Sequence, residues 1–200
     1  MKLIAMVIYN WKEDGSVELL NCYELGFLNF FQRGTVKEHI KFHSRLVMNR
    51  TPKGQKRSID MDQNLGKCYS FVHPEGIGAC VLVDNEYPMR VAFTLVNEAI
   101  KTFLANNSGK WENVTADTSI PSPEIETMFA KFQNPAEADK LTKIEKDLDE
   151  VKGVVMQSMD DLLKRGESLD ALMSKSKDLS NTSVQFYRTA KKNNQCCKMY

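Results

Sequence analysis

The sequence predicts an α+β domain followed by one long coiled-coil helix, and three observations lead to this fold class. Up to about Phe132, apolar runs of strand length alternate with segments of helical periodicity. Beyond Gln133-Asn134-Pro135, strand patterns give way to Lys, Asp, Ser and Leu. From Leu141 to Ala190, apolar residues recur every 3.5 residues, the period of a left-handed coiled coil. We therefore expect a domain at 1–132, a linker at 133–138, a coiled-coil motif at 139–194 and a tail at 195–200.

The first elements are predicted to be a hairpin and a helix. Lys2 to Tyr9 is almost wholly apolar, as expected of a central strand covered on both faces. Glu13-Asp14-Gly15-Ser16 supplies turn chemistry before a second strand over Val17 to Leu25. Thr35-Val36-Lys37-Glu38 has the spacing of a capping box, so a helix is expected from Thr35 towards Met48.

A second hairpin is predicted after a polar, basic stretch over Thr51 to Gly66. Its strands are Cys68 to Val72 and Ile77 to Val83, and Pro74-Glu75-Gly76 joins them. A weaker strand pattern covers Ser58 to Met61. The polar stretch therefore contains at most one further short strand.

Two helices are predicted to complete the domain. From Met89 to Leu104, apolar residues recur at helical spacing and mark the clearest amphipathic helix of the chain. Ser122-Pro123 is a good N-cap and first-turn pair for a shorter helix that ends near Phe132. Both helices are expected to pack on the sheet.

The C-terminal stripe, which we call the seam, has fifteen positions in steps of three and four residues, and eleven are apolar. Only eight of the thirty-five intervening residues are apolar, so the period is well defined. The seam consists of Leu141, Ile144, Leu148, Val151, Val155, Ser158, Leu162, Arg165, Leu169, Leu172, Ser176, Leu179, Ser183, Phe186 and Ala190. A continuous helix of fifty residues would be about 75 Å long. Most of the seam must therefore meet other chains or fold back in broken pieces.

Arg165 interrupts the seam at its eighth position. A guanidinium there must find acceptors on other helices, and a polar seam residue fixes register and partner number. Gly153 and Gly166 each cost about 1 kcal/mol of helix propensity relative to alanine. The isolated segment is therefore expected to order only when it binds its partners.

The tail has the spacing of a prenylation box, because Cys197 is the fourth residue counted back from Tyr200. Cys196 immediately before it suits reversible S-acylation, and Arg188, Lys191 and Lys192 lie nearby. One lipid binds membranes marginally, whereas two lipids with basic residues hold firmly. We therefore predict Cys197 as the prenylated residue and Cys196 as the palmitoylated one.

Composition points away from several functions. The net charge of +1 does not predict a nucleic-acid partner. The five cysteines lack framework spacing, and the longest apolar run is too short to span a bilayer or to act as a secretory signal, so we expect a cytosolic protein. His39 and His43 share a helix face without further ligands at metal-binding spacing, and Gly76-Ile77-Gly78 does not open a helix. We expect no metal, no catalytic residues, and no cofactor other than covalent lipids.

Over its whole length the chain resembles the lipid-anchored longin-domain R-SNAREs, which lack a transmembrane helix. The motifs that carry the resemblance are, in order, Phe30-Phe31-Gln32-Arg33, Asp84-Asn85-Glu86-Tyr87-Pro88 with Arg90, Ala92, Thr94 and Leu95, Gln133-Asn134-Pro135, Leu148-Asp149-Glu150, Arg165-Gly166-Glu167, Leu169-Asp170, Phe186-Tyr187, Ala190-Lys191-Lys192 and Cys196-Cys197. Several are weak alone, but in this order they are specific.

The resemblance implies a longin (profilin-like) domain with an antiparallel five-stranded sheet and three helices, followed by a SNARE coiled-coil helix. It implies that Arg165 is the ionic-layer residue, which meets glutamines from three Q-SNARE helices in a parallel four-helix bundle. The implied function is vesicle docking and membrane fusion in ER–Golgi, endosome–Golgi and vacuolar or lysosomal transport. The SNARE disassembly machinery is a further implied partner.

The resemblance also implies a closed form, in which the longin domain folds against the SNARE segment and shelters the prenyl chain in an apolar groove. Phe42 matches a groove position, and His39 stands where some members have an aromatic residue. The closed form is expected in the cytoplasm. The lipid anchor is expected to hold the protein on the cytosolic face of Golgi, ER-derived vesicle, endosomal and vacuolar membranes.

Two alternatives stay open at this stage. An S-acyltransferase, an activity credited to family members, would still acylate a separate partner after replacement of Cys196 and Cys197. A longin-type adaptor or tether would tolerate Arg165→Ala and need no lipid.

Overall fold

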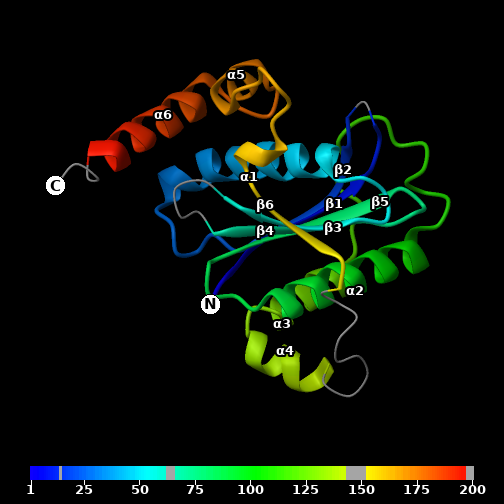
Figure 1. The fold of residues 1–200 in the computed structure, drawn as a ribbon. Coiled ribbons are helices and arrows are strands. Elements are labelled where there is room, and N and C mark those ends of the chain that lie inside the picture. Colours follow the sequence, from blue (N-terminus) through cyan, green and yellow to red (C-terminus); the bar gives the residue numbers. More distant parts are fainter. Residues whose placement is uncertain (14, 62–65, 143–151, 197–200) are drawn as a thin grey trace.

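The computed structural model describes residues 1–13, 15–61, 66–142 and 152–196, which form one sheet with helices on both faces (Figure 1). The strand order is β2-β1-β5-β4-β3-β6. The strands are β1 (Leu3–Asn10), β2 (Val17–Tyr23), β3 (Lys56–Asp60), β4 (Lys67–Val72), β5 (Ile77–Val83) and β6 (Val154–Ser158). Neighbouring strands are antiparallel except β3 and β6, which run parallel.

The apolar run of β1 is explained by its central place between β2 and β5. Side chains of a strand alternate between the two faces of a sheet. Met6 and Ile8 therefore belong to one core cluster, and Ala5, Val7 and Tyr9 belong to the other. The sheet is thus buried on both faces.

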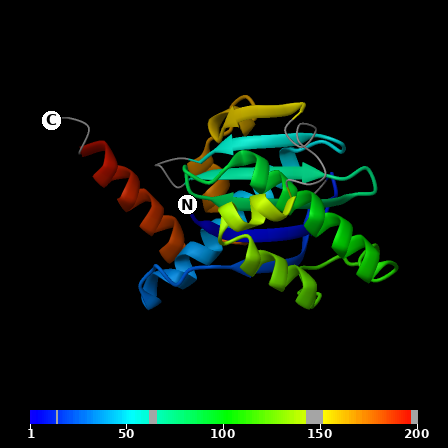
Figure 2. The same cartoon turned by 90° about the horizontal axis from the view of Figure 1, so that it is seen from below.

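Each face of the sheet has its own helical layer (Figures 1 and 2). The helices α2 (Met89–Asn107), α3 (Pro123–Lys131) and α4 (Pro135–Thr142) cover one face. The helix α1 (Phe30–Arg50) covers the other face. Tyr87 donates to the carbonyl oxygen of Phe132 (2.8 Å), and Gln133 Nε2 donates to that of Leu3 (3.0 Å). The first bond joins the segment just before α2 to the end of α3, and the second joins the residue after Phe132 to β1. Tyr87 and Gln133 each belong to one of the sequence motifs quoted above.

The helix α1 begins five residues earlier than the capping-box spacing predicts. Its first residue is Phe30, and Thr35 lies inside the helix. The Nε–H of Arg33 donates to the carbonyl oxygen of Leu28 (3.1 Å) and closes the preceding loop without a side-chain N-cap. Glu38 is engaged elsewhere, because its carboxylate accepts from the backbone N–H of Ser180 (2.7 Å).

The C-terminal segment, residues 152–196, forms several short elements instead of the single helix that the seam predicts. They are β6, the 3-10 turn η2 (Asp160–Leu162), α5 (Leu169–Lys175) and α6 (Asn181–Cys196). Gly153 (φ +69°) and Gly166 (φ +84°) have left-handed backbone conformations that interrupt a right-handed helix. Without partner helices, the segment folds back onto the sheet and α1.

The predicted α+β fold class is confirmed, with one more strand than expected. The five antiparallel strands and α1, α2 and α3 account for the predicted domain, and β6 adds a parallel edge strand from the C-terminal segment. Helix α4 (Pro135–Thr142) covers the last four residues of the expected linker and the first four of the expected coiled-coil motif. Of the predicted seam, Ile144, Leu148 and Val151 lie outside the described residues.

Candidate functional site

The candidate site is the interface between α1 and the C-terminal segment. Six apolar side chains of the segment join the core cluster that contains α1 residues Ile40, Phe42 and Val47. These six are Met159, Leu162, Leu169, Met173, Val184 and Tyr187, each at most 8% exposed. The segment is therefore part of the hydrophobic core on this face.

Most of these buried residues are not seam residues. Met159, Met173, Val184 and Tyr187 fall between seam positions, and only Leu162 and Leu169 belong to the seam. By contrast, the seam residue Phe186 is 45% exposed. The segment therefore carries two overlapping apolar sets. One is the seam, with its 3.5-residue period; the other packs on the α1-side core and shares Leu162 and Leu169 with the seam, while Leu172 and Leu179 pack partly buried against it.

The remaining described seam positions lie at varied depths. Arg165 is exposed in the turn between η2 and α5, and Ser183 is buried. The half-buried positions are Val155, Ser158, Leu172, Ser176, Leu179 and Ala190. Leu141 lies in α4, and its side chain is outside the described ones. Cys196 ends α6, and Cys197 lies outside the described residues.

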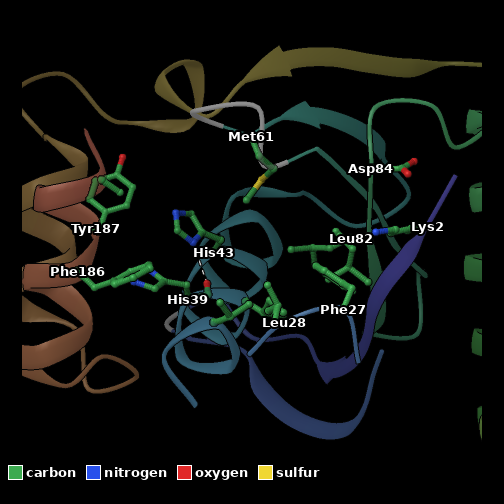
Figure 3. A pocket seen from close by; sticks show the side chains of 14 residues that line it. Lys2, Phe27, Leu28, His39, His43, Met61, Leu82, Asp84, Phe186 and Tyr187 are labelled. Carbon is green, nitrogen blue, oxygen red and sulfur yellow. Dashed lines mark hydrogen bonds between the residues drawn. The ribbon is translucent and has the colours of Figure 1, made fainter. Parts of the chain in front are cut away.

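A mainly apolar cavity of about 440 Å³ lies between α6, α1 and the sheet (Figure 3). Phe186 and Tyr187 of α6 face Leu82 and Phe27 across it, with His39 and His43 of α1 between them. Pockets of about 300–1,000 Å³ commonly bind small molecules. The cavity therefore has the size and lining of a site for an apolar ligand.

The structure places the predicted groove residue Phe42 beside this cavity rather than among its lining residues. Phe42 is buried in the core and packs edge-on against the ring of His43, with 5.0 Å between ring centroids. Its helix neighbours His39, Ile40 and His43 line the cavity instead. The resemblance had placed His39 at a groove position, and its place in the cavity lining agrees with this, whereas the place of His43 in the lining was not predicted.

Burial favours the neutral form of both histidines by lowering the pKa of each ring. Nε2–H of His39 donates to the carbonyl oxygen of Ser183 on α6 (3.0 Å), and Nδ1 of the same ring is buried without a hydrogen-bond partner among the described residues. Burial lowers the pKa of His39, and the bond to Ser183 only partly offsets this effect. Burial lowers the pKa of His43 to about 4. Both rings also lie near Tyr187, at centroid distances of 5.9 and 6.5 Å.

An ionic cluster holds the turn before α6 onto the domain. The Arg45 guanidinium bonds Asp178 (2.7 and 3.2 Å) and Asp117 (2.6 and 3.0 Å), and Lys41 Nζ lies 2.8 Å from Asp117. Burial alone would raise the pKa of Asp117, but the bonds from Arg45 and Lys41 hold it well below its usual range. Bidentate, partly buried pairs of this kind are stronger than ordinary surface ion pairs.

Two further polar contacts extend from α1 to the C-terminal segment. Arg50 bonds both carboxylate oxygens of Glu167 (2.9 and 3.1 Å), two residues after Arg165. Glu38 accepts from the backbone N–H of Ser180 at the start of α6, where a negative charge is favoured by the helix dipole. One face of α1 thus binds the segment from Glu167 to Ser183.

Comparisons with known proteins agree with this organisation. A family model described as a regulated-SNARE-like (longin) domain matches residues 25–129, and a synaptobrevin model matches residues 140–200. The chain is 37% identical over 199 residues to the VAMP-like protein YKT61 of Arabidopsis thaliana, with 98% of each chain covered. It is 35% identical over 199 residues to the synaptobrevin homolog YKT6 of Debaryomyces hansenii, again with 98% of each covered.

The chain belongs to the longin-domain R-SNAREs. It is therefore an R-SNARE of vesicle trafficking, a class that interacts with other SNAREs and is not an enzyme class. The first described domain is the longin domain, and the C-terminal segment belongs to the SNARE motif. Among helices in the described ranges, none combines the length and apolarity needed to cross a bilayer.

Acidification is predicted to loosen α6 from the longin domain. Release of α6 exposes His39 to water, so its pKa returns towards the usual 6.5 and the open form binds protons more readily. The contribution of the histidines to the closed form is complete above about pH 6.5 and is lost as pH falls towards the pKa of His43 near 4. Amide hydrogen exchange of α6, corrected for intrinsic rates, should become about tenfold faster at pH 5 than at pH 7.5.

The variant His39→Gln is the control for this pH dependence. The amide can keep a donor near Ser183 but does not titrate, so part of the acceleration at pH 5 should disappear. An unchanged pH profile in this variant would assign the effect to other groups, such as Glu38.

Asp178→Asn is predicted to weaken the ionic cluster and loosen the α5–α6 region. Arg45 then loses one of its two carboxylate partners in a partly buried site. Hydrogen exchange of α6 should accelerate about tenfold at neutral pH. The matched change Asp160→Asn, at an exposed acidic residue of the same segment, should have little effect. Equal exchange in both variants would contradict the cluster's role.

Proposed function

We propose that this R-SNARE stores its SNARE motif on its longin domain and releases it to form a parallel bundle with three Q-SNARE helices. The observation that supports this proposal is the separation of the two apolar sets. Met159, Met173, Val184 and Tyr187 hold the segment closed, whereas the seam is suited to binding other helices. Closed packing therefore depends on four buried side chains that the bundle would not use, together with seam residues that both arrangements share.

The proposed transition is a change of secondary structure as well as a release. In the closed form, Val154 to Ser158 pair with β3 as a strand, although Val155 and Ser158 are predicted seam positions. In the bundle the same residues would be helical, and Gly153 and Gly166 would leave their left-handed conformations. The seam would bury eleven apolar residues, and Arg165 would meet the glutamines of the three partner helices. Partner helices must supply the free energy for this refolding.

We propose that the tail attaches the bundle to a membrane through prenylated Cys197 and S-palmitoylated Cys196. Before membrane attachment, the prenyl chain would occupy the cavity between α6 and α1. Three features support this occupant: the apolar lining, the volume of about 440 Å³, and the position of Cys196 at the end of the helix that forms one wall. Ala190 lines the cavity, and Cys196 lies six residues further along α6, or about 9 Å.

The proposed trafficking steps are those implied by the resemblance, namely ER–Golgi, endosome–Golgi and vacuolar or lysosomal transport. A cytoplasmic closed form would exchange with a lipid-anchored form on the cytosolic faces of these membranes. After fusion, the SNARE disassembly machinery would separate the four helices. The released motif would then be able to return to α1.

The adjacent pair Leu172 and Met173 provides the experiment that tests this function. Leu172 is a seam residue that packs only partly buried against the closed core, and Met173 is fully buried in that core. Met173→Ala should open the chain and accelerate assembly with three Q-SNARE helices by about tenfold or more, because large-to-small core changes cost about 2–5 kcal/mol. Leu172→Ala should instead lower the melting temperature of the assembled complex. Assembly is measured by size-exclusion chromatography and circular dichroism.

Two outcomes would contradict the proposal. Failure of the unaltered chain to form a stable four-chain complex would remove the bundle function. Equal effects of the two substitutions on assembly rate and on complex stability would show that the apolar sets are not separate.

Cys197→Ser is predicted to prevent prenylation and to abolish membrane attachment. Incorporation of isotope-labelled isoprenoid and the share of protein that floats with membranes provide the two measurements. Cys196→Ser should retain the isoprenoid but bind membranes more reversibly, because one lipid alone gives marginal affinity. Normal membrane attachment of the Cys197→Ser chain would exclude the proposed anchor.

A further inference from the structure

Three phenylalanines near the start of α1 form an exposed apolar surface that the closed interface does not use. Phe31 is 92% exposed, Phe30 78% and Phe27 48%, and we call these residues the phenylalanine patch. Phe30 and Phe31 contact each other edge to face, with 5.8 Å between ring centroids. Adjacent exposed aromatic rings indicate an interaction surface rather than ordinary surface composition.

The loop that carries the patch is held by its own hydrogen bonds. The backbone N–H of Leu28 donates to the carbonyl oxygen of Leu25 (3.0 Å), and that of Gln32 donates to the carbonyl oxygen of Asn29 (2.9 Å). Arg33 turns back and donates to the carbonyl oxygen of Leu28 (3.1 Å). The rings are therefore presented to solvent by an ordered loop.

The patch is continuous with the cavity between α6 and α1. Phe27 belongs to the patch and also lines the cavity, across from Phe186 of α6 (Figure 3). Phe186 is itself 45% exposed. Partly exposed aromatic rings thus lie on both sides of the cavity, and the patch extends outward from one of them.

Cationic groups accompany the patch. The ammonium of Lys2 lies 4.5 Å from the ring centroid of Phe27, and that of Lys37 lies 5.3 Å from the ring centroid of Tyr23. Of the nearby carboxylates, Asp84 and Glu86 are paired with the amino terminus at 3.3 and 3.4 Å. The Glu24 carboxylate, in the same loop, accepts from the backbone N–H of Gly26 (2.9 Å), so the surroundings carry both signs of charge, and Lys2 is the cation placed directly over a ring of the patch.

We propose that the phenylalanine patch inserts into the water–lipid interface of a bilayer while the chain is closed. Aromatic rings favour this interface, and adjacent cations favour anionic headgroups. The patch would orient the cavity towards the bilayer, so that a lipid leaving the cavity enters the membrane directly. The proposal rests on the lipid part of the proposed function, because the cavity wall formed by α6 leads to the Cys196-Cys197 pair.

A tryptophan reporter tests insertion directly. The full chain with Cys196→Ser is coupled through Cys197 to a maleimide lipid in phosphatidylcholine–phosphatidylserine vesicles, so that attachment does not depend on prenylation. Brominated phospholipids quench only indoles that reach the bilayer. Emission from Phe31→Trp, after subtraction of the parent chain's Trp11 and Trp111, should fall about twofold when these lipids are included.

Met156→Trp is the matched control. Met156 is 69% exposed on the edge strand β6, outside the patch, and its indole should keep full emission on the same vesicles. Unquenched emission from Phe31→Trp on a vesicle-bound chain would overturn the proposal. Equal quenching at both positions would also overturn it, because the whole surface would then contact lipid without orientation.

A second measurement separates this inference from the proposed function. The double change Phe30→Ser and Phe31→Ser should reduce flotation of the uncoupled, unlipidated full chain with the same vesicles on the order of tenfold. Assembly with the three Q-SNARE helices should be unchanged. Lost assembly with unchanged flotation would assign the patch to a protein partner and reject the bilayer. If the parent chain fails to assemble, the SNARE proposal fails, while the quenching result still decides the inference.

Discussion

The packing of Met173, Val184 and Tyr187 onto α1 is the interaction on which the rest of the site depends. It places α6 across α1, and this crossing forms the cavity, buries His39 and His43, and brings Asp178 to Arg45. The polar contacts alone would be weak, because partly exposed ion pairs contribute little without a fixed geometry. Burial of the apolar side chains fixes the position of the C-terminal segment on α1. The hydrogen bonds and ion pairs then determine which residues of the segment face which residues of α1.

One segment would serve both the closed structure and the proposed bundle because only the seam requires a single continuous period. The seam follows a 3.5-residue repeat, which requires a continuous helix. The closed set is spread over η2, α5 and α6, which turns at Gly166 and at the Ser180 cap connect. In these short elements the seam residues no longer form one continuous stripe. Each element can instead turn its buried residues outside the seam towards the core. The closed structure therefore leaves part of the seam exposed, as the apolar Phe186 and the charged Arg165 are here.

Sequence periodicity predicted the elements whose partners are close in the chain. Both hairpins and the helices after Met89 and Ser122 follow from local apolar patterns and turn residues, and the structure confirms them. The strand β6 was not predictable in this way, because its pairing with β3 joins residues almost a hundred positions apart. Glu38 was predicted to form a capping box with the nearby Thr35. Instead, its carboxylate accepts from the backbone N–H of Ser180, which is 142 residues further along the chain. Long-range contacts override local propensity in both cases.

The composition of the interface between α1 and the C-terminal segment suits the proposed release of the segment. Its apolar part is modest, with six buried side chains from the segment, and several of its polar contacts are partly solvent-exposed. In the proposed transition, a larger and fully apolar interface would compete with the bundle, whereas this one would be displaced by partner helices that bury the longer seam. The cavity lining also combines apolar and polar groups. His39 and His43 lie beside Tyr187 and make the lining less apolar than one built of phenylalanine alone. A lipid in this cavity, as proposed above, would therefore be held less tightly than in a bilayer, and a membrane at the cavity's edge would favour its release.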